Sequence, residues 1–142
     1  MLLEEMIINE IKWRLRENKI IKNQIILGRK NKVVDRIPLS STSYEAVPER
    51  ILQFRLKEVI HSVQHVGTFF EKIFIVFYTS FDDPHLTGYK VFIIEKRKVQ
   101  IFEILPMEED SEIIQVFSCG PLRKNQKDDF LKTLQKIQKL IP

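Results

Sequence analysis

Three segments of the chain carry hydrophobic residues at the three- and four-residue spacing of one face of an α-helix. The first covers residues 2–16, the second begins at Pro48 and ends before Gly67, and the third follows Asn125, a suitable N-cap with Asp128 at the third helical position. Their apolar faces consist of Leu3, Ile7, Ile8, Ile11 and Leu15 in the first segment, Leu52, Leu56, Val59, Ile60 and Val63 in the second, and Phe130, Leu134, Ile137 and Ile141 in the third. The pattern predicts three amphipathic helices.

Runs rich in β-branched and aromatic residues separate the helical segments and predict β-strands. They are residues 20–27, 33–37, 72–80, 89–95, 99–105 and 112–118. The first two flank a polar turn and predict a hairpin, and the last four are expected to pair as an antiparallel meander. In the run 72–80 both alternating faces are apolar, which is typical of a strand in the middle of a sheet that is covered on both sides.

The order of these elements is helix, two strands, helix, four strands, helix, without an internal repeat or a β-α-β-α alternation. This order predicts an α+β fold in which a single antiparallel sheet of about four to six strands is packed by three helices. The length of 142 residues fits one domain that covers residues 1–142, and a hydrophobic content of 44% is enough to form its core.

Three features of the sequence bear on the location of the protein. The longest apolar run, residues 73–78, is far shorter than the roughly 18 residues that a membrane-spanning helix needs. Glu4 and Glu5 stand where a secretory signal peptide has basic residues. Cys119 is the only cysteine, so no disulfide can form within the chain. We therefore expect an intracellular protein, cytoplasmic or nuclear, without a membrane span.

The patterns that carry catalysis or cofactor binding are incomplete in this chain. Its glycines form neither a dinucleotide-binding motif nor a P-loop. His85-Leu86-Thr87 is one H-x-T unit, whereas two-histidine phosphoesterases use two such units. His61 and His65 have the i, i+4 spacing of helical metal ligands but supply only two of the ligands of a closed site. We expect no enzymatic activity, no cofactor and no metal site.

One acidic arrangement leaves a metal-dependent phosphodiesterase or nuclease as a third hypothesis. The spacing between Asp82 or Asp83 and Glu95 is similar to that of nucleases in which carboxylates on adjacent strands hold a divalent metal. His85 lies close to the two aspartates in the sequence. Those enzymes have a lysine two residues after the second acid, and here Arg97 occupies that position. Because arginine cannot give up its proton, we favour the alternative interpretation, a hairpin turn with ordinary charges.

Positive charge is concentrated in the first quarter of the chain. The segment 12–36 has nine basic residues against two acidic ones, a charge of +7, while the rest of the chain sums to −3. These basic residues are Lys12, Arg14, Arg16, Lys19, Lys22, Arg29, Lys30, Lys32 and Arg36, and a second basic turn consists of Lys96, Arg97 and Lys98. Concentrated positive charge suits a phosphate backbone or an acidic protein, so nucleic-acid binding is our second hypothesis. Lysines in hairpin turns also protect against aggregation, which is the alternative interpretation.

The first helical segment has more apolar residues than one buried stripe requires. Leu2, Met6 and Trp13 lie on a face beside the predicted core stripe, where they either join the core or contact a partner. A large aromatic residue among aliphatic ones is typical of protein interfaces. Our main hypothesis is therefore a non-enzymatic protein–protein interaction module or subunit of a larger assembly, whose partner is another protein or a second copy of the chain.

Overall fold

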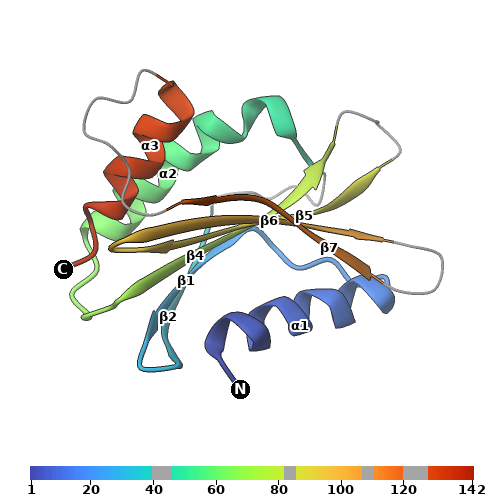
Figure 1. Ribbon diagram of the computed structural model, residues 1–142, viewed down its shortest axis with the longest axis horizontal. Coiled ribbons are helices and arrows are strands. Elements are labelled where there is room, and N and C mark those ends of the chain that lie inside the picture. The colour runs from blue at the N-terminus through green and yellow to red at the C-terminus, as the bar shows by residue number, and fades with distance from the viewer. Residues whose placement is uncertain (40–45, 82–85, 107–110, 120–127) are drawn as a thin grey trace.

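The computed structural model describes residues 1–39, 46–81, 86–106, 111–119 and 128–142 and is built around one open sheet (Figure 1). Six strands pair in the order β2-β1-β4-β5-β6-β7, and each neighbouring pair is antiparallel. The strands are β1 (Gln24–Arg29), β2 (Lys32–Pro38), β3 (Val47–Pro48), β4 (Lys72–Ser80), β5 (Thr87–Glu95), β6 (Lys98–Pro106) and β7 (Ser111–Cys119). The two-residue β3 pairs parallel to β4 at its far end.

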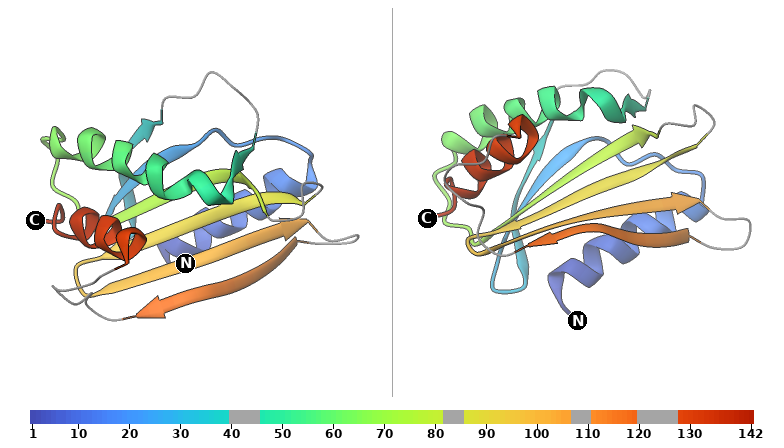
Figure 2. Two further views of the ribbon diagram at one scale, coloured as in Figure 1. Left: turned by 90° about the horizontal axis from the view of Figure 1, so that it is seen from above. Right: turned by 45° about the horizontal axis from the view of Figure 1, so that its top comes forward.

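Helices cover the two faces of the sheet unequally. The helices are α1 (Leu3–Arg16), the 3-10 turn η1 (Glu49–Ile51), α2 (Leu52–Gln64) and α3 (Asp129–Gln138). Helix α1 lies alone on one face, whereas α2 and α3 lie side by side on the other (Figures 1 and 2). The predicted α+β class, with three helices and an antiparallel sheet, is confirmed.

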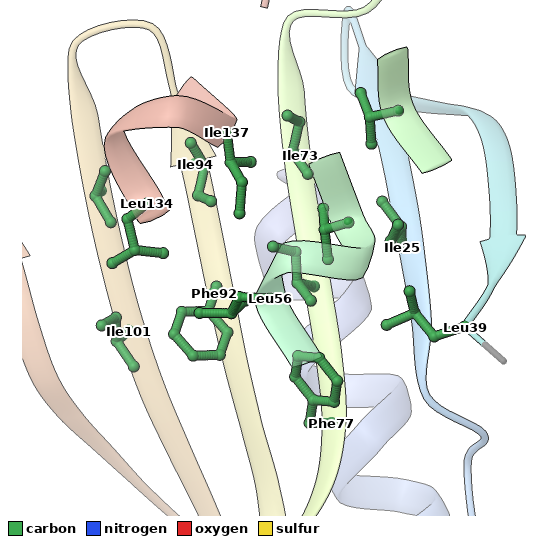
Figure 3. Packing of buried hydrophobic residues seen from close by; sticks show 14 of the residues in the cluster. Ile25, Leu39, Leu56, Ile73, Phe77, Phe92, Ile94, Ile101, Leu134 and Ile137 are labelled. Atoms are coloured by element: carbon green, nitrogen blue, oxygen red, sulfur yellow. The ribbon is translucent and has the colours of Figure 1, made fainter. Parts of the chain in front are cut away.

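The larger hydrophobic cluster fills the space between the sheet and helices α2 and α3. Figure 3 shows Leu56 of α2 and Leu134 of α3 above Phe77 of β4 and Phe92 of β5. The rings of Phe77 and Phe92 meet edge to face with their centroids 6.3 Å apart, a favourable geometry for two aromatic rings. All four side chains are completely buried, so this cluster anchors both helices to the sheet.

A smaller cluster lies on the opposite face of the sheet, under α1. Leu3, Ile7 and Ile11 of that helix are buried against alternate residues of the strands. Those strand residues are Ile26 of β1, Phe74 and Val76 of β4, Tyr89, Val91 and Ile93 of β5, and Ile104 of β6. Because β4 contributes to both clusters and is paired on both edges, its predicted position in the middle of the sheet is confirmed.

The first hairpin differs from its prediction at both ends. Strand β1 begins at Gln24 and not at residue 20, and the turn consists of only Lys30 and Asn31. Both turn residues have positive φ, 49° and 59°, as a tight two-residue hairpin turn requires. The polar run 28–32, which contains a glycine, predicts a longer turn, whereas Gly28 lies inside β1 and its φ is not positive.

The ends of two helices also differ from the sequence predictions. Pro48 precedes a short 3-10 turn, so the regular α-helix begins at Leu52. The N-cap of α3 is Asp128, whose carboxylate accepts a hydrogen bond from the backbone N–H of Leu131 at 3.1 Å. The predicted N-cap, Asn125, lies outside the described residues. Either residue type can cap a helix, and a spacing argument alone does not choose between them.

Candidate interaction surfaces

The outward face of α1 carries a row of apolar side chains. Leu2, at the N-cap, is 53% exposed, Met6 is 40% exposed and Trp13 is 49% exposed. A helix turns by about 100° per residue, so these three positions share one line with Asn9 and point away from the buried Leu3-Ile7-Ile11 stripe. We call Leu2, Met6, Asn9 and Trp13 the outer stripe of α1. The structure therefore leaves the predicted partner-binding residues together and open to solvent.

Basic groups surround the indole ring of Trp13. The guanidinium carbon of Arg14 lies 5.3 Å from the ring centroid, and the ammonium nitrogen of Lys19 lies 5.6 Å from it. Both distances are within the range of a cation–π attraction. An exposed aromatic ring with two cations close to it presents an apolar surface beside positive charge, which favours an apolar contact flanked by carboxylates.

Polar contacts fix the N-terminal end of α1 to the sheet. The first helical N–H, that of Leu3, donates to the side-chain oxygen of Asn31 in the β1–β2 turn at 3.3 Å. Glu4 forms an ion pair with Lys72 at the start of β4. The ammonium nitrogen of Lys72 also lies 3.4 Å from a carboxylate oxygen of Glu95 at the end of β5. These contacts hold the outer stripe on a rigid support, since the helix cannot slide along the sheet without breaking them.

This ion-pair network shifts the pKa values of two of its members. Burial alone would raise the pKa of Glu4, but the hydrogen bond from Lys72 and the charges of Lys72 and Lys98 outweigh it and lower that pKa below 4.5. Burial alone would lower the pKa of Lys72, but the hydrogen bond to Glu4 and the carboxylates of Glu95 and Glu4 raise it above 10.5. Both groups are therefore charged across the neutral pH range.

The basic segment 12–36 is continuous in sequence but divided in space. One part belongs to the C-terminal half of α1 and the connection to β1 and consists of Lys12, Arg14, Arg16, Lys19 and Lys22. The other part lies at the opposite end of β1 and consists of Arg29, Lys30 and Lys32. The seven steps along the chain from Lys22 to Arg29, most of them in β1, span up to about 23 Å. Arg36 lies on β2, beside α1, and its guanidinium is 3.9 Å from the carboxylate of Glu10.

The second basic turn joins one part of the divided segment. The strand register places the β1–β2 and β5–β6 turns at the same end of the sheet. Across this end, Gly28 of β1 is opposite Lys72 of β4, Lys72 is opposite Glu95 of β5, and Glu95 is opposite Lys98 of β6. Neighbouring strands are about 4.8 Å apart, which places the two turns about 10 to 15 Å from each other. We call this group the basic tip; it consists of the exposed residues Arg29, Lys30, Lys32, Lys96, Arg97 and Lys98.

An exposed aromatic ring that was not among the sequence candidates lies at the basic tip. Phe69 is 46% exposed, and the guanidinium carbon of Arg29 lies 4.8 Å from its ring centroid. The backbone N–H of Glu71 donates to the carbonyl oxygen of Gly28 at 2.8 Å, which holds this connection against β1. Phe69 follows α2 by several residues and touches the hairpin only through the fold, so no local sequence pattern places it there.

A hollow of about 280 Å³ lies on the other face of the sheet, between the start of α2 and α3. It is lined by Glu49, Arg50, Leu52, Gln53, Lys90 and Phe130. The ammonium nitrogen of Lys90 is 3.3 Å from the carboxylate of Glu49, so two of the three charged residues that line the hollow pair with each other, and the third is Arg50. This pairing makes the hollow a poor candidate for a catalytic site.

The structure describes only some of the sequence candidates for catalysis and metal binding, namely Glu95, His61 and His65. Asp82, Asp83 and His85 lie outside the described residues; the backbone N–H of Phe81 donates to the carbonyl oxygen of Leu86 beyond the last pair of β4 and β5. Glu95 ends the same β5 strand eight residues after Thr87, about 26 Å away. His61 and His65 are exposed, and within the described ranges no three histidine, cysteine or acidic residues form a group that could hold a metal ion.

No protein-family model, no curated protein and no solved structure matches this chain. Within the described residues, no helix is long and apolar enough to cross a membrane.

Proposed function

We propose that this protein is a non-enzymatic interaction module, or a subunit of a larger intracellular assembly, whose contact surface is the outer stripe of α1. The observation that carries the proposal is the exposure of Leu2, Met6 and Trp13 in one line on a helix that is fixed to the sheet. A half-exposed tryptophan on a rigid helix presents a large apolar area at little cost in side-chain entropy. The single cysteine of the chain agrees with a reducing compartment.

The surroundings of the outer stripe define the chemistry of the partner. Arg14 and Lys19 line Trp13, so a complementary surface has an apolar centre and carboxylates on its rim. Interfaces of this kind concentrate their binding energy in a few central residues, and truncation of one such residue costs about 2 kcal/mol or more. Trp13 is the expected central residue, because it has the largest side chain of the stripe.

Differential affinity capture followed by direct binding tests this proposal. A partner captured from the source cells by the wild-type protein would be purified and titrated by calorimetry against Trp13→Ala, Met6→Ser and Phe54→Ala. Phe54 is the matched control, since it is a 57% exposed aromatic residue on α2. We expect Trp13→Ala to weaken binding about 30-fold or more and Phe54→Ala to leave it unchanged. Equal affinities of Trp13→Ala and the wild-type protein would overturn the proposal.

Nucleic-acid binding is a second candidate function, favoured by one observation at the basic tip. Two basic turns that are more than 60 residues apart in sequence lie at the same end of the sheet, beside the exposed ring of Phe69. Positive charge beside an accessible aromatic ring is the combination that binds single strands, because phosphates pair with the cations and a base stacks on the ring. The ion-paired Lys72 and Glu95 lie between the two turns.

Fluorescence anisotropy with labelled single-stranded and duplex oligonucleotides, at about 50 and 200 mM salt, tests this second function. Arg29→Glu combined with Lys32→Glu removes charge from the basic tip, and Arg14→Glu combined with Lys19→Glu is the control at the other end of the sheet. Phe69→Ala is expected to weaken single-strand binding by about 1 to 3 kcal/mol and to spare duplex binding. Equal binding by the two charge-reversed variants, or no binding at either salt, would contradict this function.

A further inference from the structure

We propose that the partner of the outer stripe is a second copy of this chain, with the two α1 helices packed antiparallel about a two-fold axis. This inference rests on the proposed function and names its partner. Most homo-oligomers are symmetric dimers in which the same patch is buried on both copies, so the patch must be complementary to itself. The outer stripe meets that requirement in its apolar spacing and in its flanking charges.

The spacing of the outer stripe matches that of two interlocking helices. Leu2, Met6, Asn9 and Trp13 follow one another at intervals of four, three and four residues, the alternation of the core positions of a coiled coil. In an antiparallel pair, Trp13 packs against Leu2 of the second copy and Met6 against its Asn9, and the two-fold axis repeats both contacts. The large indole is thus opposed by an aliphatic side chain at each end of the contact.

The flanking charges select the antiparallel direction. Helix α1 is acidic in its first turn, with Glu4 and Glu5, and basic in its last turn, with Arg14 and Arg16. Antiparallel packing places Glu5 of one copy beside Lys12 of the other, and the symmetry makes this opposite-charge contact twice. A parallel pair would instead place Glu5 beside Glu10 of the second copy, a contact of like charges. The helix dipoles are also opposed in the antiparallel arrangement, which is favourable.

The size of the contact and its one polar core residue define a weak dimer. A helix of 14 residues is about 21 Å long, so the surface it buries falls below the roughly 800 Å² per partner of a standard interface. Asn9 in the central layer fixes the register at a cost in affinity, as a single core asparagine does in coiled coils. The dimer is therefore expected to dissociate in the micromolar range or above.

Sedimentation equilibrium of the purified chain, from about 5 to 500 µM, measures this association directly. The wild-type protein is expected to shift from monomer to dimer over this range, and Trp13→Ala and Met6→Lys are expected to stay monomeric. Glu5→Lys and Lys12→Glu are each expected to raise the dissociation constant about threefold or more, and the double variant to restore it, because it exchanges the two charges of the same pair. Lys57→Glu on α2 is the control for the change of net charge in Lys12→Glu, and circular dichroism verifies that each variant is folded.

The outcomes separate this inference from the function on which it rests. A wild-type protein that remains monomeric at every concentration overturns the second-copy proposal, while the calorimetric test of Trp13 with a captured partner still decides whether the outer stripe is a contact surface. A dimer that Trp13→Ala does not weaken overturns the location of the interface. Single charge variants that weaken the dimer without restoration in the double variant overturn the antiparallel pairing of Glu5 with Lys12.

Discussion

Gly88 of β5 lies close to the backbone of β6. A Cβ atom at this position would overlap the carbonyl oxygen of Ile104, and a backbone atom cannot move aside as a flexible side chain can. We expect Gly88→Ala to lower the free energy of unfolding by about 1 to 3 kcal/mol, because the strands must separate locally. Gly67→Ala is the matched control, since nothing lies within 4 Å of a Cβ there. Urea denaturation of both variants measures the difference, and equal stabilities would contradict the close approach.

Lys30 adopts a backbone conformation that is unfavourable for a residue with a Cβ atom. Its φ of 49° lies in the left-handed region, which costs a residue with a Cβ about 1 kcal/mol or more relative to glycine. Lys30→Gly is therefore expected to stabilise the protein by about that amount while removing one charge from the basic tip. Chemical denaturation tests the gain. A loss of stability would show that the lysine side chain contributes more than its backbone conformation costs.

Helix α1 owes part of its attachment to the ion pair between Glu4 and Lys72. Because the pKa of Glu4 is lowered on folding, its contribution is complete above pH 4.5 and is lost as the pH falls through the folded value. Because the pKa of Lys72 is raised, its contribution is complete below pH 10.5 and is lost as the pH rises through the folded value. The pair therefore stabilises the fold between these limits, and this stabilisation is lost outside them.

The substitution Glu4→Gln removes the dependence of stability on pH that the Glu4 carboxylate causes at acidic pH. We expect the variant to be less stable than the wild-type protein at pH 7 and the difference to shrink as the pH falls below 4.5. Glu10→Gln is the control on the same helix, since Glu10 and Arg36 are 3.9 Å apart and both nearly half exposed, a geometry that contributes little. Thermal unfolding at several pH values gives the comparison. A difference that does not change with pH would exclude the ion pair as its cause.

At the scale of elements, the sequence predicted the helices and strands that have a regular hydrophobic periodicity. It did not predict the irregular backbone conformations of turns. The stripe Leu3-Ile7-Ile11 identifies the buried side of α1, and its angular position also places Trp13 outside that buried stripe. The sequence did not predict the Lys30-Asn31 turn, because lysine rarely adopts the left-handed backbone conformation. The register of the hairpin imposes this conformation on Lys30. Such details are decided by contacts between elements and not by the residues of one element.

At the scale of the whole molecule, the order of strands decides which surfaces exist. The sequence shows two basic turns, but only the pairing of β1, β4, β5 and β6 places Arg29 and Lys98 at one end of the sheet. Lys12 and Arg29 belong to one continuous basic segment, but Lys12 lies in the C-terminal half of α1, whereas Arg29 lies at the end of β1 that faces the N-terminal end of this helix. Strand order depends on contacts distant in sequence, so the division of charge could not be predicted from local patterns.

The two hydrophobic clusters share one sheet, so we expect α1 to unfold in the same cooperative transition as α2 and α3. Ile7→Ala under α1 and Leu56→Ala under α2 both leave a cavity at a buried site, and each is expected to cost about 2 to 5 kcal/mol. Trp13, the only tryptophan, reports on α1 by fluorescence, while far-ultraviolet circular dichroism reports on the whole chain. We expect the two probes to give coincident transitions in both variants. An earlier fluorescence transition in Ile7→Ala would instead show that α1 detaches before the sheet unfolds.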